Sequence, residues 1–348
     1  MIAARIGVLV FSLALAVSAS AAGLMTARDA LKQPETWFKS DQGRGVLENV
    51  LSNQSPLGGW PKNTNTAAVR FTGDSSTIKG TFDNGATTDE LRLLTKAFNA
   101  TREPRYRAAI LKGLDHILLA QYPTGGWPQF YPPGKAYHRH ITYNDNAMLR
   151  LMEFLRDVAT DKDFAFIDTE RRTKSQAAFD RGIDCIVQSQ IKVKGPLTVW
   201  CAQHDEITLE PRPARAFELV SLSGSESSGL LLLLMSLEKP SPEVVRAVHA
   251  GAKWYETTKL TGLRQEKIDD DKKIIRDPNA PPLWARFYEM ETNRPIFSGR
   301  DSVKKYDMSE IESERRNGYA WYGSWGVGVA KRYGQWRQQW PENAAKSQ

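Results

Sequence analysis

The tetrapeptide Gly-Gly-Trp-Pro occurs twice in this chain, within GGWPKNTN at residues 58–65 and within GGWPQFYP at residues 125–132. The two tryptophans, Trp60 and Trp127, lie 67 residues apart (127 − 60). A pair of glycines lets a chain reverse direction tightly, and proline interrupts the geometry that precedes it. Each copy follows a predicted helix and precedes a long polar loop that leads into another predicted helix. The repeated tetrapeptide therefore indicates a repeated structural unit.

A third, weaker copy extends the repeat. The first loop ends in TFDNGATTDELRLL at residues 81–94, and the second ends in HITYNDNAMLRLMEF at residues 140–154. The third unit carries KGPLTVWCAQHDE at residues 194–206, where Trp200 lies 73 residues beyond Trp127 (200 − 127). Periods of about 70 residues, each a helix pair with a loop, are typical of helical hairpins arranged around an axis. We predict a mainly α fold: an incomplete α/α toroid of helical hairpins, with a few short strands and with its long loops gathered at one end. The alternative is a chance match of four residues.

Apolar residues recur at helical spacing along most of the chain. The segment Thr87-Thr88-Asp89-Glu90 is a Thr-x-x-Glu capping box, which predicts a helix start at this point. Further helices are expected at residues 106–121, 146–158, 174–190, 226–238 and 242–258 and from about 319 to 340. Short strands are expected around residues 191–195 and 197–203.

The N-terminus has the pattern of a secretory signal peptide. Arg5 precedes an apolar run over residues 6–17, and the small residues 19–21 form a cleavage site. The apolar run is too short to span a bilayer, and no later stretch is suited to be an anchor. We expect residues 1–21 to be removed and residues 22–348 to form a single toroid domain that is secreted or periplasmic, with no membrane partner.

Composition narrows the class of partner. Lys and Arg number 47 against 40 Asp and Glu, which gives a net charge of +7 and a pI near 9.2 and mildly favours an anionic partner. No long Lys/Arg run is present, so nucleic acid is not expected. Cys185 and Cys201 could pair in an oxidising compartment or remain as two buried thiols. No cluster of His or Cys accompanies them, so they do not suggest zinc.

Two carboxylates stand out in the polar loops. Asp83 in TFDNGATTDE and Asp145 in YNDNAM each adjoin an asparagine and lie just before a predicted helix. Helix N-capping is one interpretation of either residue. If equivalent loops of a toroid point at one cleft, however, two carboxylates with neighbouring amides would form an oxygen-rich site suited to calcium.

Arginines gather in the third loop and in a fourth polar stretch, residues 283–302: Arg212, Arg215, Arg286, Arg294 and Arg300. A guanidinium grips a carboxylate through two parallel hydrogen bonds, so arginines facing acidic loops would suit a bound sugar acid. The alternative is that Arg212 and Arg215 are solvated or pair with Glu210 and Glu218.

Five ordered motifs resemble the family 10 pectate lyases: GGWPK, TFDNGATTDE, TYNDNAM, RPARAFELVSLSGSES and PIFSGRDS. The resemblance spans Gly58 to Tyr322, which is nearly the whole mature chain. It implies a mostly helical, irregular α/α toroid, in agreement with the repeat. It also implies cleavage of polygalacturonate, (1→4)-α-D-galacturonan, by calcium-assisted anti β-elimination, which leaves 4,5-unsaturated oligogalacturonides.

The resemblance also implies roles for individual residues. Asp83 and Asp145 would hold Ca²⁺, and Arg215 would be the base that takes the C5 proton. The residues expected to bind substrate are Arg286, Arg300, Lys62 and Arg212. We expect a monomer whose partner is polygalacturonate.

Two other functions remain open on the sequence alone. An inverting glycoside hydrolase of the toroid type acting on an acidic polysaccharide would use two carboxylates, either Asp83 with Asp145 or Asp145 with Glu226. A non-catalytic protein that binds an acidic polysaccharide is the second alternative. The arginines favour free acids over methyl esters in each case, because esterification removes the charge that they would bind.

Overall fold

The computed structural model describes residues 24–342, and the predicted signal peptide at residues 1–21 lies outside them. This part of the chain is mainly helical, as predicted, with long loops and short strands. Within it, no helix is both long enough and apolar enough to cross a membrane. Cys185 and Cys201 are buried free thiols, so the two cysteines do not form the disulfide that the sequence left open.

The α-helices of residues 24–342 lie close to the predicted positions, except for those at 27–30, 41–52 and 313–318, which were not predicted. The α-helices are α1 (Ala27–Ala30), α2 (Asp41–Ser52), α3 (Thr88–Thr101), α4 (Pro104–Leu119), α5 (Ala147–Thr160), α6 (Thr169–Ser189), α7 (Glu226–Leu234), α8 (Pro242–Thr258), α9 (Ser313–Gly318) and α10 (Trp325–Gln339). The capping box at Thr87 and Glu90 is present at the start of α3. The last helix begins at Trp325 rather than near residue 319, because Tyr322 and Gly323 pair with another strand.

The strands form antiparallel pairs. They are β1 (Ile141–Thr142) with β2 (Gln203–His204), β3 (Leu222–Ser223) with β7 (Phe287–Tyr288), β4 (Leu263–Ile268) with β5 (Asp271–Arg276), β6 (Trp284–Ala285) with β10 (Tyr322–Gly323), and β8 (Phe297–Ser298) with β9 (Lys304–Lys305). The strand expected at residues 197–203 is wrong over most of its length. Only a bridge between Lys192 and Leu197 and the first residue of β2 remain, because the chain turns tightly here through bonds between Ile191 and Thr198.

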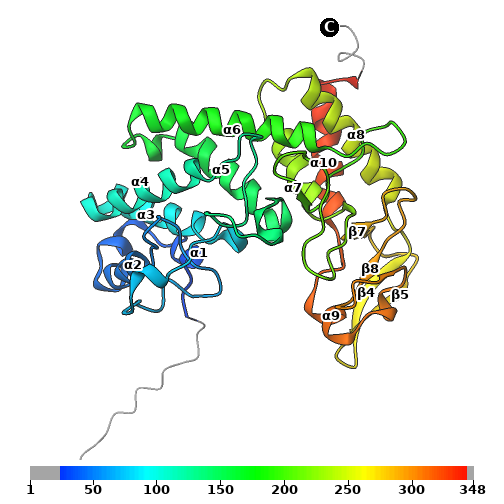
Figure 1. Ribbon diagram of the computed structural model, residues 1–348, viewed down its shortest axis with the longest axis horizontal. Helices are drawn as coiled ribbons and strands as arrows, with labels where there is room; N and C mark the ends of the chain where they lie inside the picture. The colour runs from blue at the N-terminus through cyan, green and yellow to red at the C-terminus, as the bar shows by residue number, and fades with distance from the viewer. Residues whose placement is uncertain (1–23, 343–348) are drawn as a thin grey trace, which may run out of the picture.

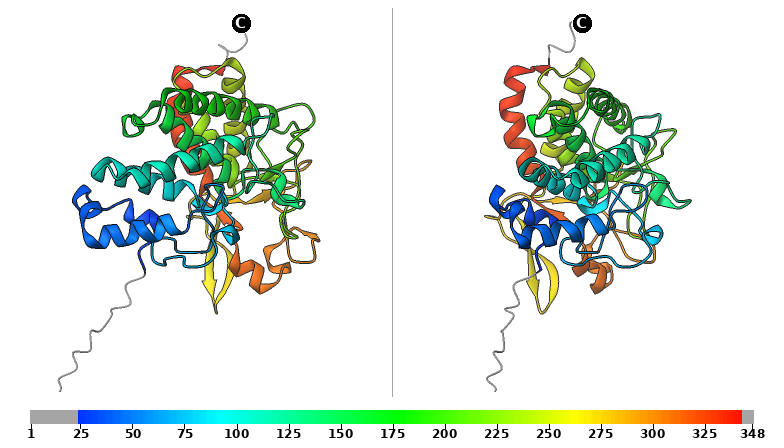
Figure 2. Two further views of the ribbon diagram at one scale, coloured as in Figure 1. Left: turned by 60° about the vertical axis from the view of Figure 1, so that its left-hand side comes forward. Right: turned by 90° about the vertical axis from the view of Figure 1, so that its left-hand side faces the viewer.

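The helices form two rows (Figures 1 and 2). One row, here named the inner row, contains the helices that follow the long loops: α3, α5, α7 and α10 contact one another in this order. The outer row contains α2, α4, α6 and α8, of which α4, α6 and α8 are in successive contact. Each inner helix packs on an outer one, as in α3 with α4 and α5 with α6. The β4–β5 hairpin and α9 form a lobe that projects from the helical body (Figure 1).

Buried tryptophans explain the sequence repeat. The indole Nε1 of each donates to a carbonyl of the preceding outer helix: Trp60 to Val50 (2.7 Å), Trp127 to Ile117 (2.9 Å), Trp200 to Ile186 (2.6 Å) and Trp284 to Tyr255 (2.9 Å). The four rings are at most 3% exposed. Trp284 marks a fourth unit that the sequence analysis missed. The β4–β5 hairpin lengthens the spacing there, and no Gly-Gly pair precedes the tryptophan.

A glutamine tethers each of the first three units to the next. The Nε2 atoms of Gln54, Gln121 and Gln190 each donate to a carbonyl of their own turn, at 2.9 Å in all three cases. Each also donates to a carbonyl of the next outer helix: Ala109 (2.9 Å), Ala178 (2.8 Å) and Ala247 (3.0 Å). This contact recurs at the repeat spacing, so the Gly-Gly-Trp-Pro match is not a matter of chance.

We predict that Gly125→Ala destabilises the protein by about 2–4 kcal/mol. Gly125 has φ +91°, and a Cβ atom there would lie 2.1 Å from the backbone oxygen of Arg181 in α6. Gly195→Ala is the matched control, since Gly195 has φ +104° with nothing within 4 Å and its substitution meets only the cost of a left-handed backbone, about 1–2 kcal/mol. Urea unfolding measures both. Equal losses would mean that the close approach to α6 does not matter.

Candidate active site

Asp83 and Asp145 lie in corresponding turns of the first two loops, with Asp83 at the first position of its turn and Asp145 at the second. Each lies on a 3-10 turn ahead of an inner-row helix: η3 (Asp83–Gly85) before α3 and η5 (Asn144–Asn146) before α5. The turns need left-handed backbone, with φ +55° at Asn84 and +51° at Asp145, which Asn and Asp adopt more readily than other residues with a side chain. The turns η3 and η5 are in contact, so the two acidic loops meet.

Helix capping does not account for these carboxylates. The N-cap of α3 is Thr87, which shares its capping box with Glu90. The residue at the start of α5 is Asn146, and its side chain makes no capping hydrogen bond. The side chains of Asp83 and Asp145 are therefore available to groups on other loops.

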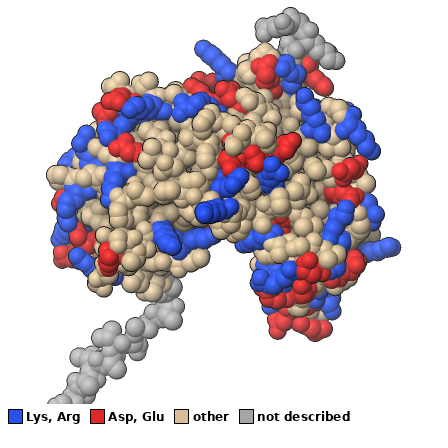
Figure 3. All heavy atoms as spheres, viewed as in Figure 1, with Lys and Arg blue, Asp and Glu red and all other residues tan. Residues whose placement is uncertain are grey.

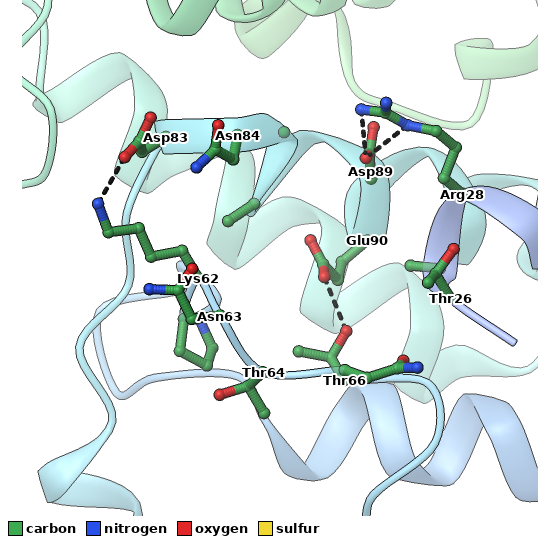
Figure 4. A pocket seen from close by; sticks show the side chains of 15 residues that line it. Thr26, Arg28, Lys62, Asn63, Thr64, Thr66, Asp83, Asn84, Asp89 and Glu90 are labelled. Atoms are coloured by element: carbon green, nitrogen blue, oxygen red, sulfur yellow. Dashed lines mark hydrogen bonds and ion pairs between the residues drawn. The ribbon is translucent and has the colours of Figure 1, made fainter. Parts of the chain in front are cut away.

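Asp83 is buried, with only 3% of the residue exposed. Its Oδ2 atom accepts from Lys62 Nζ at 2.5 Å and from Gln129 Nε2 at 2.7 Å. Lys62 and Gln129 follow the two copies of Trp-Pro, so corresponding positions of two repeats converge on one carboxylate. Asp83 Oδ1 and Gln129 Oε1 are buried without a hydrogen-bond partner among the described residues. Figure 4 shows the ion pair of Lys62 and Asp83 at one side of the pocket that both residues line.

The residue two positions after a repeated tryptophan contacts the loop of the preceding unit. Backbone N–H groups of these loops donate to its carbonyl: Phe82 to Gln129 (2.9 Å), Asn144 to Ala202 (2.9 Å) and Gly224 to Arg286 (2.8 Å). The side chains at this position therefore lie beside acidic residues of the neighbouring unit. Gln129 meets Asp83 in this way, and Arg286 meets Glu226.

Arg286 joins three units at the centre of the site. Its Nη2 atom donates to Asp145 Oδ1 at 3.0 Å, to Asn144 Oδ1 at 3.1 Å and to Glu226 Oε1. Its guanidinium lies 4.4 Å from the centre of the Tyr319 ring. Burial would lower the pKa of Arg286, but the charges of Glu226, Tyr319 and Asp145 outweigh it and raise the pKa above the ordinary value. Arg286 is therefore a permanent cation held against two carboxylates.

Arg215 lies beside this cluster on the same aromatic ring. Its Nε and Nη2 atoms donate to the two oxygens of Glu218, at 2.8 and 2.5 Å. Its guanidinium lies 4.8 Å from the centre of the Phe217 ring and 5.8 Å from that of Tyr319. The bonds to Glu218 raise the pKa of Arg215, and the charge of Asp145 acts in the same direction. The pairing of Arg215 with Glu218, which the sequence left as an alternative, is thus present within the site.

Arg212 and Arg300 are not in contact with the acidic loops. Arg212 Nε donates to Asp205 Oδ2 at 3.0 Å in its own loop. Arg300 Nη2 donates to Glu314 Oε1 at 3.0 Å, and its side chain is 64% exposed. Glu314 also pairs with Arg315, whose guanidinium lies 4.6 Å from the Phe217 ring. Two ion pairs, Arg300–Glu314 and Glu314–Arg315, therefore separate Arg300 from the Phe217 ring.

The surface is hollowed beside the acidic loops. A pocket of 280 Å³ next to Asp83 is lined by parts of α1, of residues 61–66 and of residues 83–90. A second hollow of 450 Å³ adjoins it at Lys62 and includes Gln129, Phe130 and His138. Figure 3 shows a hollow between the helical body and the lobe of β4, β5 and α9, with Lys and Arg side chains at its upper edge. Cations thus border the space in which an anionic ligand would lie.

A buried carboxyl closes the floor of the smaller pocket. Desolvation raises the pKa of Glu90 to about 7, although hydrogen bonds from Thr66 and Thr87 oppose that shift. Asp89 beside it is paired with Arg28 of α1 at 2.9 Å (Figure 4). Glu90 and Asp89 are thus occupied in holding the start of α3 to the loop and to the N-terminal segment.

The donor set around Asp83 and Asp145 fits a hard cation. It consists of carboxylate and amide oxygens, the ligands that Ca²⁺ prefers, and two of these oxygens are buried and unpartnered. Elsewhere among residues 24–342, His140, Asp205 and Glu206 lie close enough together to hold a metal. Arg212 pairs with Asp205 of that cluster, and Arg139 pairs with Glu206.

Three residues of the site were not predicted from the sequence. Gln129 could have been found, because it occupies the same place in the second repeat as Lys62 in the first. Glu218 was considered only as an ion-pair partner of Arg215, in an interpretation that gives Arg215 no role in function. Tyr319 was assigned to a helix, and no local pattern marks the ring that supports both Arg215 and Arg286.

Comparisons with known proteins agree with this geometry. The family model described as pectic acid lyase matches residues 54–330. A family 10 polysaccharide lyase from Cellvibrio cellulosa has a similar structure, with a TM-score of 0.79 and 36% sequence identity over 89% of this chain and 94% of that one. A point mutant of the Cellvibrio cellulosa family 10 lyase, solved in complex with trigalacturonic acid, has a TM-score of 0.78 and 35% identity over 92% of this chain and 100% of that one. Comparison with curated protein sequences gives no significant match.

The resemblance drawn from the five sequence motifs is confirmed by the family match and by the solved structures. The family match covers most of the chain and includes all four units with their repeated tryptophans. The chain belongs to the pectic acid lyase family and is a polysaccharide lyase of the family 10 type.

Proposed function

We propose that this lyase cleaves (1→4)-α-D-galacturonan by calcium-assisted anti β-elimination and releases 4,5-unsaturated oligogalacturonides. The observation that carries the proposal is the meeting of Asp145, Arg286 and Arg215 around Tyr319, with the Asp83 loop in contact beside them. Three separate loops contribute the charged groups. The trigalacturonic acid bound to the Cellvibrio structure supports the same class of substrate.

The reaction removes the proton on C5 of a galacturonate and expels the oxygen on C4. That proton is weakly acidic, so negative charge developing on the adjacent carboxylate must be stabilised. A calcium ion held by Asp83 and Asp145, with Gln129 as a further oxygen donor, would act as a Lewis acid on that carboxylate. Arg286 adds a fixed cation at the same place. Lys62 is a second cation that faces the pocket beside Asp83, and it would pair with a substrate carboxylate.

Arg215 is the proposed base, and its environment predicts a strong pH dependence. Only the neutral form accepts a proton, and Glu218 raises the pKa of Arg215. Below the pKa, the neutral fraction therefore rises about tenfold with each pH unit, so turnover should increase toward alkaline pH. Arg300 and Arg212, which border the site without touching the acidic loops, are proposed to contact more distant sugars.

An inverting glycoside hydrolase fits the geometry less well. Asp145 and Glu226 both bind the same nitrogen of Arg286, so their oxygens are closer together than the ~6.5–9.5 Å that an inverting mechanism requires. Glu226 is also buried, with 2% of the residue exposed. Membership of a lyase family argues against both this alternative and a protein that only binds polysaccharide.

We further propose that the two helical rows form an incomplete α/α toroid and that residues 22–348 are a single catalytic domain. Cleavage of a signal peptide at residues 1–21 would deliver that domain to the periplasm or the exterior as a monomer. Free acids rather than methyl esters are the proposed substrate, because the cations bordering the hollow bind charge.

Incubation with polygalacturonate should produce an increase in near-ultraviolet absorbance from the unsaturated product, and a calcium chelator should abolish it. The double bond arises only by elimination, so the absorbance separates the lyase from a hydrolase. Loss of polymer viscosity without this absorbance would contradict the proposed reaction.

Replacement of the proposed base, Arg215→Ala, should lower kcat by at least about 10²-fold, the usual minimum for loss of a general base, while polygalacturonate binding stays measurable. The matched control is Arg246→Ala, at an exposed position on α8 that is paired with Glu243; it should retain full activity. In the wild type kcat should increase with pH through the alkaline range. A single optimum near pH 5 would remove Arg215 from this role.

The variant Asp145→Ala should raise the calcium concentration needed for half-maximal activity by at least about 10-fold. Asp145 is the more exposed of the two proposed ligands, with a side-chain exposure of 32% against 4% for Asp83. The substitution should therefore cost mainly the left-handed backbone at φ +51°, about 1–2 kcal/mol, and the variant should still fold. Asp301→Ala, at a surface position paired with Lys305, is the control. An unaltered calcium titration in Asp145→Ala would contradict the assignment.

A further inference from the structure

Glu218 lies buried beneath Arg215, and its contacts go beyond an ordinary ion pair. The residue is 2% exposed. It accepts from the backbone N–H of Arg215 at 3.1 Å, from Arg215 Nε at 2.8 Å and from Arg215 Nη2 at 2.5 Å. A fourth bond comes from the hydroxyl of Tyr319 at 2.8 Å. Its backbone N–H donates to the carbonyl of Arg215 at 2.8 Å, so the turn that carries both residues is closed on itself.

These contacts leave one part of Arg215 available. The planar guanidinium is held along its Nε–Nη2 edge, which fixes both its position and its plane. Its third nitrogen, Nη1, donates to no protein atom in residues 24–342. The side chain is nevertheless 40% exposed. Nη1 is therefore the nitrogen through which Arg215 can meet a substrate.

Tyr319 connects the pair of Arg215 and Glu218, here named the clamp, to the rest of the site. Its hydroxyl bonds to Glu218, and its ring lies under Arg215 and under Arg286, at 5.8 and 4.4 Å from the two guanidinium carbons. Phe217 packs edge-on against the same ring, with centroids 5.1 Å apart. The two arginines therefore share one rigid support, and their separation is fixed by it.

The clamp can assist turnover only through geometry. A carboxylate beside Arg215 raises its pKa, and this disfavours the neutral form that would accept a proton. Glu218 can contribute by orienting Arg215. A misplacement of a catalytic group by about 1 Å costs up to about 10²-fold in rate.

We propose that Glu218, aided by Tyr319, is a positioning residue that holds Arg215 by its Nε–Nη2 edge so that Nη1 faces the C5–H bond of the substrate. This inference rests on the proposed function and assigns Glu218 no contact with the substrate.

The test is Glu218→Asp, which keeps the negative charge and shortens the side chain by one methylene. We expect kcat on polygalacturonate to fall at least about 10-fold and KM to change less than about 3-fold, because substrate binding does not depend on Glu218. Unchanged kcat in a folded Glu218→Asp enzyme would overturn the proposal.

A double-mutant cycle separates positioning from a general structural role. In the Arg215→Ala background, Glu218→Asp should cause no further loss of the residual turnover, because Glu218 acts only through Arg215. An equal loss in both backgrounds would refute the proposal. If Glu218→Asp does not fold, Tyr319→Phe decides, since it keeps the ring and removes one bond to Glu218: kcat should fall with KM retained, and an unchanged kcat would refute the proposal.

Failure of the proposed function gives a different result. A wild-type enzyme that forms no unsaturated product from polygalacturonate would contradict the lyase reaction itself. A wild-type enzyme that forms it, with normal kcat in Glu218→Asp, would contradict only the positioning role.

Discussion

The site depends on the burial of one indole ring in each unit. An indole N–H in a dry core must find an acceptor, and in all four units it finds a carbonyl of the preceding outer helix. This bond fixes where the chain leaves the helix. The residue two positions later then receives a backbone hydrogen bond from the loop of the preceding unit at three successive junctions. Acidic loops far apart in the sequence are thereby held side by side.

Carboxylates at the site lie beside cations and amide groups. Lys62 and Gln129 contact Asp83, and Arg286 lies between Asp145 and Glu226. Buried carboxylates without partners would be costly and would be neutralised by protonation. Lys62 and Arg286 offset that cost by pairing with the carboxylates, and Asp83 Oδ1 and Gln129 Oε1 remain unpartnered among the described residues.

The sequence predicted the helices and the repeat because both depend on local patterns: apolar spacing, a capping box and a rare tetrapeptide. It also placed Asp83, Asp145, Arg215 and Arg286 in loops that do meet. The fourth unit was missed because the β4–β5 hairpin, built on two left-handed residues at Asp269 and Asp270, is inserted between α8 and Trp284. Ion-pair partners could not be predicted, because Arg212 and Arg300 pair with Asp205 and Glu314 through loop conformations that follow no sequence period.

The position two residues after the repeated tryptophan explains where a substrate can enter. The third unit has Ala202 at the place occupied by Gln129 and Arg286 in its neighbours, so only its carbonyl meets the Asp145 loop. No side chain from that position covers the carboxylate. Asp145 keeps a side-chain exposure of 32%, against 4% for Asp83 and 1% for Glu226. Among these three carboxylates, Asp145 is thus the most accessible to a ligand, and it contacts Arg286.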